Sequence, residues 1–470
     1  MHHTIKTIGT IMATAMLTTT TGGAADDPIP PLSEERVQEI KDLRWGMFIC
    51  WSFSTFSGVE WTAGVEDVDF FRATDLDTDQ WARVAKEAEM GYILFLAKHH
   101  DGFCLWDTET TDRKVTHAPL GRDVLAELRE SVDRHGIKLA LYFSEGDWTW
   151  PGSRDGQLYG SGPNPEAKKA QLEELLTQYG PIEYIWFDHA AGTGGLSHAE
   201  TIAWVKSFQP DCLVGFNHGD QTGADIRLGE RGRPGPLDDH SAAGPHMGNP
   251  PSDSYRVAEF TYPILPGKPP RQGGADWFYS LPEYDHLVHP PEKLYADYLG
   301  AVKYENLFSI NVGPDYEGRL REVDVQTLRA VGEMIRNPPP VPLSQFATVR
   351  ASSEWSPAFS AAHAVDGDAT TRWGAAADTR SGWIEVDLGS EQAIGRITIV
   401  EQAYPRTQDF AIEVRDGDGW RELHRGTTIA GRLDLDLPEV HARHVRLHIH
   451  RATEVPTIEE FQIHPPQAAP

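Results

Sequence analysis

The sequence predicts an α/β protein in which a (β/α)8-like barrel is followed by a β-sandwich domain. Between residues 45 and 336, continuously apolar β-type segments alternate with segments of helical period. Apolar strands separated by helices are typical of a parallel sheet that is covered on both faces. Beyond residue 343 the apolar residues recur at every second position, which is typical of half-buried antiparallel strands. A chain of 470 residues also exceeds what one hydrophobic core usually organises, so we expect two domains.

The barrel prediction depends on how many strands alternate with helices. Residues 79–90 place Trp81, Val84 and Ala88 on one helical face, and residues 166–179 have the same period. A closed barrel needs eight strands and seven are evident, so one is degenerate or lies in a long loop. A doubly wound open sheet is the alternative, but no GxGxxG motif follows the first strand, and polar residues follow several strands. The predicted strands are residues 46–51, 92–97, 137–143, 182–187, 213–216, 256–260 and 307–312.

A proline-rich segment separates the two predicted domains. Residues 338–343 contain four prolines, which neither continue a helix nor donate to a sheet, so we expect a stiff linker. The barrel domain is then residues 26–337, and the β-sandwich is residues 344–470. The strands predicted in the second domain are residues 383–388, 394–400, 410–415, 432–437 and 444–449.

Residues 1–25 have the pattern of a secretory signal peptide. Lys6 precedes an apolar run at residues 8–17, and small residues lead up to Ala25, where we place the cleavage site. This pattern predicts a secreted or periplasmic protein; an unstructured leader without a targeting role is the alternative. No other segment reaches the roughly 18 apolar residues that a membrane helix requires.

Composition excludes several classes of partner and chemistry. The formal net charge is -28, and phosphate binding needs clustered cations, so we expect neither a nucleic-acid nor an anionic-membrane partner. Three cysteines, Cys50, Cys104 and Cys212, lie far apart in the sequence. They form neither a disulfide scaffold nor a CxxC metal pair.

Asp188 is the most informative residue of the chain. It ends the strongly apolar and aromatic strand at residues 182–187. A buried charge must be offset by hydrogen bonds or used in chemistry, and the strand has no structural need for one. We therefore interpret Asp188 as a candidate nucleophile.

Histidines and a Glu-Trp pair follow two other strands. His99 and His100 come directly after residues 92–97, where they would project from the barrel mouth toward sugar hydroxyls or a metal. Two hydrogen-bonded core histidines are the alternative, and a metal is disfavoured because no carboxylate accompanies them at ligand spacing. Glu60 and Trp61 combine an acid, which accepts from hydroxyls, with an indole, which packs on the apolar face of a pyranose.

Taken together, these motifs resemble glycoside hydrolase family 29, the α-L-fucosidases, over roughly residues 40–337. The motifs that carry the resemblance are Trp45-Gly46-Met47-Phe48-Ile49, Glu60-Trp61, Ala97-Lys98-His99-His100-Asp101-Gly102-Phe103, Gly121-Arg122-Asp123, Leu141-Tyr142-Phe143-Ser144, Gly146-Asp147-Trp148, Trp186-Phe187-Asp188 and Asn311-Val312-Gly313-Pro314.

The resemblance implies a role for each matching residue. Asp188 matches the nucleophile, and Trp186 matches a residue that lines the pocket. His99 and His100 match residues that bind the sugar hydroxyls, and Glu60 with Trp61 matches the wall near the 3- and 4-hydroxyls.

The resemblance to one branch of that family indicates which residue is the general acid/base. In the branch selective for α-1,3/1,4-linked fucose it is a Glu some forty residues after the nucleophile that follows an Asp-Ile-Arg segment, and Glu230 matches it here. Arg227 is then a supporting or pocket residue. A surface pair of Glu230 with Arg231 is the alternative, and Glu259 at the end of another strand is the reserve candidate.

Cys50 departs from the family pattern. Most members carry a His at this position, which meets the axial 4-hydroxyl of the sugar, and a thiol is a weak substitute for an imidazole. Either Ser52 or Ser54 takes over the contact, or the sugar differs from plain L-fucose. Nothing near Cys50 in sequence lowers its pKa, which disfavours a reactive thiol.

Long loops indicate how the rest of a glycan is bound. The Gly/Pro-rich stretches at residues 151–165 and 232–253 are long for barrel connections, and Trp148 and Trp150 directly precede the first of them. Such long loops usually shape a binding rim. A branched or decorated glycan fits this rim; insertions for stability or oligomer contacts are the alternative.

The second domain resembles the F5/8 type C, or discoidin, family. The matching segments are Ala364-Val365-Asp366-Gly367-Asp368-Ala369-Thr370-Thr371-Arg372-Trp373, Trp383-Ile384-Glu385-Val386-Asp387-Leu388-Gly389 and Ile458-Glu459-Glu460-Phe461. In that family the Asp-Gly-Asp loop and a late Glu often hold a structural calcium, which prefers oxygen ligands. The resemblance implies Asp366, Asp368, Thr371 and Glu460 as ligands; an Asp-Gly turn without an ion is the alternative.

The sequence therefore predicts a retaining exo-α-L-fucosidase that acts on fucosylated oligosaccharides or polysaccharides, with α-1,3/1,4 linkages expected. No cofactor is expected for catalysis. The alternatives are a glycan-binding protein with an inactive barrel, and a hydrolase of a related sugar such as L-galactose or a sulfated fucose.

Overall fold

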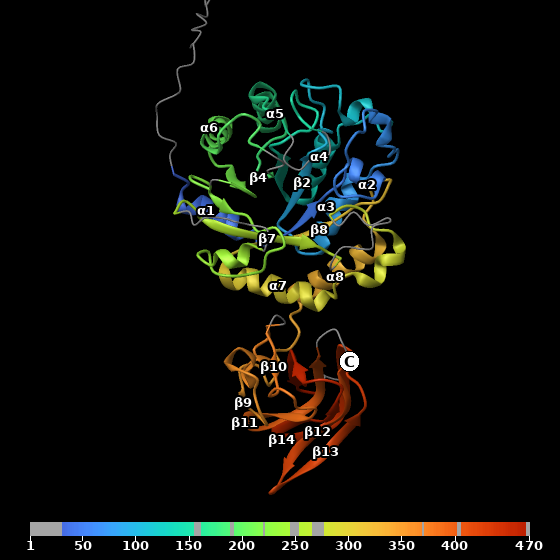
Figure 1. Cartoon of the computed structure of the whole chain (residues 1–470), viewed down its shortest axis with the longest axis vertical. Coiled ribbons are helices and arrows are strands. Elements are labelled where there is room, and N and C mark those ends of the chain that lie inside the picture. Colours follow the sequence, from blue (N-terminus) through green and yellow to red (C-terminus); the bar gives the residue numbers. More distant parts are fainter. Residues whose placement is uncertain are drawn as a thin grey trace, which may run out of the picture.

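The computed structural model describes residues 31–154, 161–188, 192–219, 221–244, 253–265, 277–368, 371–401 and 406–466. The predicted signal peptide at residues 1–25 lies outside these ranges. The first domain is a parallel sheet of eight strands in the order β5-β4-β3-β2-β1-β8-β7-β6, surrounded by helices (Figure 1). The (β/α)8-like prediction is confirmed. The strands are β1 Trp45–Ile49, β2 Tyr92–Lys98, β3 Lys138–Ser144, β4 Tyr184–Asp188, β5 Leu213–Phe216, β6 Ile226–Arg227, β7 Val257–Pro263 and β8 Leu307–Val312.

The strand that the sequence did not reveal is β6. It has two residues and pairs in parallel with β7. On its other side, the Asp225 amide donates to the Val214 carbonyl at 2.8 Å, and the Asp225 carboxylate accepts from the Val214 amide at 3.0 Å. A side chain thus substitutes for part of the β5–β6 ladder, and the barrel is nearly closed.

Helices between the strands begin at recognisable caps. Asp123 caps α4 and Asn164 caps α5, where Pro165 occupies the first turn. Ser197 forms a capping box with Glu200 at the start of α6. The helices of this domain are α1 Glu34–Lys41, α2 Phe53–Ser57, α3 Thr78–Glu87, α4 Val124–His135, α5 Pro165–Gln178, α6 His198–Phe208, α7 Pro291–Tyr304 and α8 Glu322–Arg336.

The barrel interior is filled by aromatic side chains. The Tyr92 hydroxyl bonds to Ser309 Oγ at 2.7 Å, and the Tyr184 ring lies edge-on to the Tyr92 ring with centroids 5.9 Å apart. Gly46 leaves room for the Tyr92 ring, because a Cβ at position 46 would lie 2.5 Å from its Cζ. The interior is thus a packed core, and open space is left to the strand ends.

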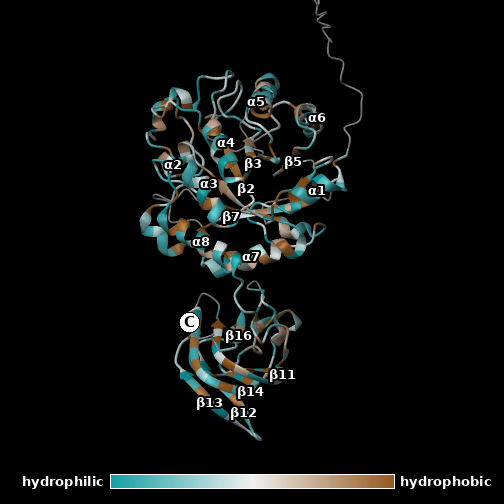
Figure 2. Cartoon of the chain, turned by 180° about the vertical axis from the view of Figure 1, so that it is seen from behind, coloured by the Kyte–Doolittle hydropathy of each residue, from teal (hydrophilic) through white to brown (hydrophobic). Residues whose placement is uncertain are grey.

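The second domain is an antiparallel β domain with its own hydrophobic core. Six strands form one sheet in the order β13-β12-β14-β11-β16, with β9 on β11, and β10 pairs with β15. Hydrophobic and hydrophilic residues alternate along β12 and β14 (Figure 2). The strands are β9 Thr348–Ala351, β10 Trp373–Gly374, β11 Gly382–Val400, β12 Thr407–Asp416, β13 Gly419–Gly426, β14 Arg432–Ala452, β15 Thr457–Ile458 and β16 Glu460–His464.

Two pairs of predicted strands are single long strands. Residues 383–388 and 394–400 both belong to β11, and residues 432–437 and 444–449 both belong to β14. The register between β11 and β14 shifts after Asp387 and again after Ile394, so the polar residues there form irregularities within one strand. Residues 338–342 form neither helix nor strand. The domain boundaries remain a prediction from the sequence. None of the helices in the described ranges is long and apolar enough to cross a membrane.

The packing of Tyr92 against Gly46 is testable by a double-mutant cycle. Gly46→Ala should destabilise the protein by about 1–3 kcal/mol, because the added methyl group meets a ring that Ser309 holds in place. In the Tyr92→Leu background the same substitution should cost less, which thermal unfolding would measure. Strictly additive losses would contradict this account of the barrel interior.

Candidate active site

Asp188 ends β4 at the carboxyl end of the barrel, where sites of this fold are built. The Tyr142 hydroxyl donates to its Oδ2 at 2.6 Å, and the Asn217 amide Nδ2 donates to its Oδ1 at 3.1 Å. The side chain is 16% exposed. Both oxygens therefore accept hydrogen bonds, as the partial burial of a carboxylate requires.

Glu230 lies next to Asp188. The same Asn217 Nδ2 donates to Glu230 Oε2 at 2.9 Å, so the two carboxylate oxygens are no farther apart than the sum of these two bonds. The backbone holds Glu230 in place, because a parallel bridge pairs it with Thr261 and the Arg231 amide donates to the Thr261 carbonyl at 2.7 Å. The structure thus brings the two predicted acids together.

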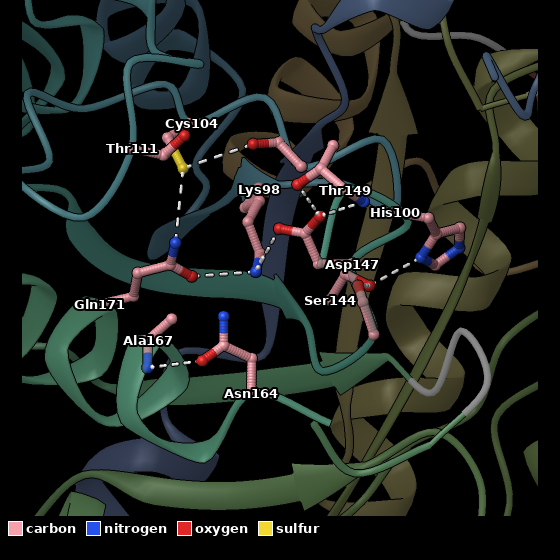
Figure 3. A network of polar contacts seen from close by, with 12 residues as sticks. Lys98, His100, Cys104, Thr111, Ser144, Asp147, Thr149, Asn164, Ala167 and Gln171 are labelled. Carbon is pink, nitrogen blue, oxygen red and sulfur yellow. Dashed lines mark hydrogen bonds and ion pairs between the residues drawn. The ribbon is translucent and has the colours of Figure 1, made fainter. Parts of the chain in front are cut away.

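His100 faces the same carboxylate. Ser144 Oγ donates to the Gly146 carbonyl at 2.6 Å and lies 2.7 Å from His100 Nδ1, so it accepts the Nδ1 proton (Figure 3). Nε2 is then the ring atom directed into the site, 3.5 Å from Asp188 Oδ2. The hydroxyl of Ser144 therefore fixes how this imidazole is presented.

His99 stacks on His100 with ring centroids 4.0 Å apart, and the Phe278 ring packs edge-on at 5.3 Å. Burial, with the neighbouring His100, holds the pKa of His99 well below its usual value, so the ring is neutral. Its Nδ1 has no hydrogen-bond partner among the described residues. A neutral imidazole with an unused nitrogen is suited to bind a sugar hydroxyl.

Four aromatic rings, called the aromatic floor here, pack together beside Asp188. Trp186 stacks on Tyr142 with centroids 5.3 Å apart, and Phe48 lies against both rings. Trp277 packs on Phe48 at 6.0 Å and carries the Arg231 guanidinium over its ring at 5.2 Å. The floor is therefore an apolar surface, and the Tyr142 hydroxyl at its edge donates to Asp188.

Glu259, the reserve acid, is buried in contact with this floor. It is 1% exposed, and Trp186 Nε1 donates to its Oε2 at 3.4 Å. Burial raises the pKa of Glu259 to about 8, so its carboxyl group is neutral near pH 7. Glu259 is thus enclosed by protein, whereas Glu230 lies next to Asp188, which favours Glu230 as the acid that meets a substrate.

Glu60, Trp61 and Trp148 lie around the predicted rim. The Glu60 carbonyl accepts from Ser54 Oγ at 2.8 Å, and Trp61 is 45% exposed. Trp148 is buried, with its ring 5.5 Å from that of His100. Trp61 thus offers an open indole face, whereas Trp148 backs the histidine.

Cys50 is buried beside the same acids. Burial raises the pKa of the Cys50 thiol well above its usual value, and the charges of Asp188, Glu60 and Glu230 raise it further. The thiol therefore stays protonated, which excludes a thiolate nucleophile near neutral pH. Of the two serines considered as substitutes, Ser54 is engaged by the Glu60 carbonyl, whereas the Ser52 hydroxyl has no hydrogen-bond partner among the described residues.

Arg227 supports a loop. Its Nη1 donates to the carbonyls of Pro236, Leu237 and Asp239 at 3.2, 2.6 and 2.8 Å, and the side chain is buried. Of the two roles considered for Arg227, supporting or pocket residue, this geometry favours the supporting one.

A buried polar shell surrounds the strand ends. Lys98 Nζ lies 3.3 Å from Asp147 Oδ2 and 2.9 Å from Gln171 Oε1 (Figure 3). Lys168 Nζ bonds to Glu145 Oε1 at 2.6 Å. These ion pairs hold the loop after β3, whose Glu145 amide donates to the Asp188 carbonyl at 2.8 Å.

Three site residues have no predicted role in the sequence: Tyr142, Asn217 and Trp277. Asn217 directly follows β5, so it is a polar residue at a strand end, and this was an available signal. Tyr142 precedes Ser144 by two positions and shares its face of β3. Trp277 follows residues outside the described ranges, and no local pattern indicates its place.

In the second domain the predicted calcium ligands are partly assembled. Asp366 accepts from Thr371 Oγ1 at 3.1 and 2.9 Å, and the Asp368 carbonyl lies 3.1 Å from the same hydroxyl. Glu460 is buried, its Oε1 lacks a hydrogen-bond partner among the described residues, and burial beside Asp366 raises its pKa to about 8. The described ranges contain no group of three or more His, Cys, Asp or Glu placed to hold a metal ion.

The neutral state of Glu259 predicts a pH dependence of stability. Its folded pKa is raised to about 8, so the folded state retains a proton that the unfolded state loses above its pKa of about 4.3. Stability from this group is therefore lost as pH rises between these values, by up to about 1.4 kcal/mol per pH unit. Glu259→Gln should gain stability relative to the wild type across this range, measured by denaturant unfolding. A gain that does not grow with pH, or one that the exposed Glu173→Gln reproduces, would contradict the assignment.

Comparison with known proteins identifies the family of each domain. The profile of the family described as alpha-L-fucosidase matches residues 26–337, and that of the F5/8 type C domain matches residues 348–461. A putative alpha-L-fucosidase 1 of Oryza sativa subsp. japonica is 27% identical, over 94% of this chain and 87% of the relative. The alpha-L-fucosidase 1 of Arabidopsis thaliana is 28% identical, over 92% and 87%.

Solved structures share the fold. A glycoside hydrolase 29 family member from an unknown rumen bacterium has a TM-score of 0.55 at 26% identity, covering 94% of this chain and 79% of that chain. A Ruminococcus gnavus family 29 fucosidase in complex with fucose has a TM-score of 0.53 at 22% identity, covering 95% and 97%. The chain therefore belongs to the alpha-L-fucosidase family of glycoside hydrolases and carries an F5/8 type C domain at its carboxyl end.

Proposed function

We propose that this protein is a retaining exo-α-L-fucosidase in which Asp188 is the nucleophile and Glu230 the acid/base. The observation that carries the proposal is the bond of one Asn217 nitrogen to both carboxylates. Retaining glycosidases hold their two carboxyl groups about 5 to 5.5 Å apart, whereas inverting enzymes leave room for a water between them. The short separation supports retention.

The reaction proceeds in two displacements. In the first, an Asp188 oxygen attacks the anomeric carbon and forms a glycosyl ester, while protonated Glu230 gives its proton to the leaving oxygen. In the second, Glu230 takes a proton from water, the water oxygen bonds to the anomeric carbon, and the ester bond to Asp188 breaks. The configuration at the anomeric carbon inverts twice and is retained overall.

The pocket walls suit a single terminal sugar. The Trp186 and Tyr142 rings close the floor and provide an apolar surface for the sugar face. His99, His100 and Glu60 are proposed to bind its hydroxyls, and Trp61 is proposed to contact the sugar at the rim. A closed floor with an exposed indole at the rim favours cleavage of end sugars.

The linkage and the identity of the sugar are further parts of the proposal. The place of Glu230 after an Asp-Ile-Arg segment supports α-1,3/1,4-linked fucose. Cys50 favours a second candidate, a related glycone such as L-galactose or a sulfated fucose, because a thiol gives the sugar a weaker hydrogen-bonding partner than an imidazole. A panel of fucosylated oligosaccharides beside L-galactosides distinguishes the two.

Two proposals concern the rest of the chain. The pattern of residues 1–25 supports a secreted or periplasmic location. The raised pKa and unpartnered oxygen of buried Glu460 beside Asp366 support a structural calcium, held with Thr371 and Asp368. A divalent cation there would offset the repulsion between the two carboxylates.

The assigned acids predict distinct rescue products. Asp188→Ala and Glu230→Ala should each lose most turnover, because general acid/base catalysis alone contributes roughly 10²–10⁴-fold. Azide should restore activity to both and give glycosyl azides of opposite anomeric configuration, identified by NMR. Wild-type-like rates in either variant would remove that residue from the scheme.

Calcium binding predicts a stability change in the full chain. Adding calcium to chelator-treated protein should raise the unfolding temperature of the second domain, because ligands that bind only the folded state stabilise it. Glu460→Gln should abolish the shift, and Glu422→Gln on the surface of the same domain should retain it. Equal unfolding temperatures with and without calcium in the wild type would refute the site.

A further inference from the structure

The Asn217 side chain lies between the two acids. Its backbone amide donates to the Phe187 carbonyl at 2.8 Å and so extends the β4–β5 ladder by one step. This places Asn217 across from Asp188 at the strand ends. The side chain is fully buried, and its Nδ2 contacts one oxygen of each acid.

The orientation of the Asn217 amide follows from charge. A flipped amide would direct Oδ1 at two carboxylate oxygens, which repel it, whereas the NH2 group offers one hydrogen to each. Oδ1 has no hydrogen-bond partner among the described residues, so no contact there opposes this orientation. Asp188 Oδ1 and Glu230 Oε2 therefore each accept one amide hydrogen.

The bond from Asn217 Nδ2 to Glu230 Oε2 determines which oxygen of Glu230 carries the proton. An N–H donor binds an oxygen that accepts, and the carbonyl oxygen of a carboxylic acid accepts better than its hydroxyl oxygen. With Oε2 bound to Asn217 Nδ2, the acid form of Glu230 carries its proton on Oε1. Oε1 is then the oxygen that gives the proton to the leaving group.

We infer that Asn217 is a positioning residue that selects Oε1 of Glu230 as the proton donor and holds this carboxyl group at a fixed distance from Asp188. The inference rests on the proposed function, because it requires Glu230 to act as the acid. It deepens that function by adding a residue that acts through both catalytic acids without contacting the sugar. Protonating the leaving group depends on this geometry, whereas sugar binding does not.

The test compares two substrates that differ in their need for an acid. α-L-fucosyl fluoride releases a good leaving group and needs little protonation, whereas an α-1,3/1,4-fucosylated oligosaccharide releases a poor one. Asn217→Ala should lower kcat/KM for the oligosaccharide by about 100-fold, the order expected for a misplaced catalytic group. The loss with the fluoride should be at least tenfold smaller. KM for the fluoride should stay near the wild-type value.

Three variants make the result decisive. Asn306→Ala removes a buried amide at the start of β8, where it accepts from the Gly235 amide at 3.1 Å, and should lower both rates alike or not at all. Asn217→Ser is a smaller change that keeps one short donor, and it should show the same substrate dependence if Asn217→Ala fails to fold. Glu230→Gln, which removes the acid itself, sets the full size of the effect.

The outcomes distinguish a failure of the proposed function from a failure of the inference about Asn217. Wild-type protein that cleaves neither substrate, or a Glu230→Gln variant that slows both equally, contradicts the proposed function. Where the wild type and Glu230→Gln behave as proposed, equal losses for both substrates in folded Asn217→Ala and Asn217→Ser overturn the inference about Asn217. A selective loss with the oligosaccharide in either variant supports it.

Discussion

The catalytic domain depends on holding two carboxylates close together at the end of an apolar barrel. Two acids at this distance repel each other, and burial raises the cost of their charges, so donors must surround them. The barrel supplies these donors by strand register. Tyr142 pairs with Trp186 and Ser144 pairs with Asp188 along β3 and β4, which places the Tyr142 hydroxyl and the loop after Ser144 beside the Asp188 carboxylate. Asn217 directly follows β5, and the β4–β5 register places it across from Asp188 in the same way.

Buried ion pairs behind the strand ends keep these donors in place. Burial opposes ionisation of Glu145, but Lys168 and His198 lower its pKa overall, so this acid stays charged inside the protein. Breaking a buried pair of this kind leaves an uncompensated charge, which makes the arrangement rigid. Because the Glu145 amide donates to the Asp188 carbonyl, this ion pair also fixes the strand end that carries Asp188. Lys98 and Asp147 act likewise beside His100.

The elements and residues that could be predicted are those marked by a pattern in their own stretch of sequence. Asp188 was evident because a charge ends an apolar strand, and seven barrel strands were evident from their continuous apolar residues. β6 was not, because two residues give no periodicity and a side chain of Asp225 replaces its missing ladder. β11 and β14 were each divided in two, because polar residues at their irregularities look like turns. The role of Arg227 and the bridging contact of Asn217 depend on segments distant in sequence, which one chain without a structure does not bring together.

The proposed roles of Asp188 and Glu230, held close together by Asn217, require two successive displacements. The most direct measurement is proton NMR of the wild-type reaction, recorded before the released sugar equilibrates in solution. The account predicts that the first sugar to appear from an α-L-fucoside is the α-anomer. The β-anomer as first product would mean a single displacement by water, and it would contradict the role assigned to Asp188.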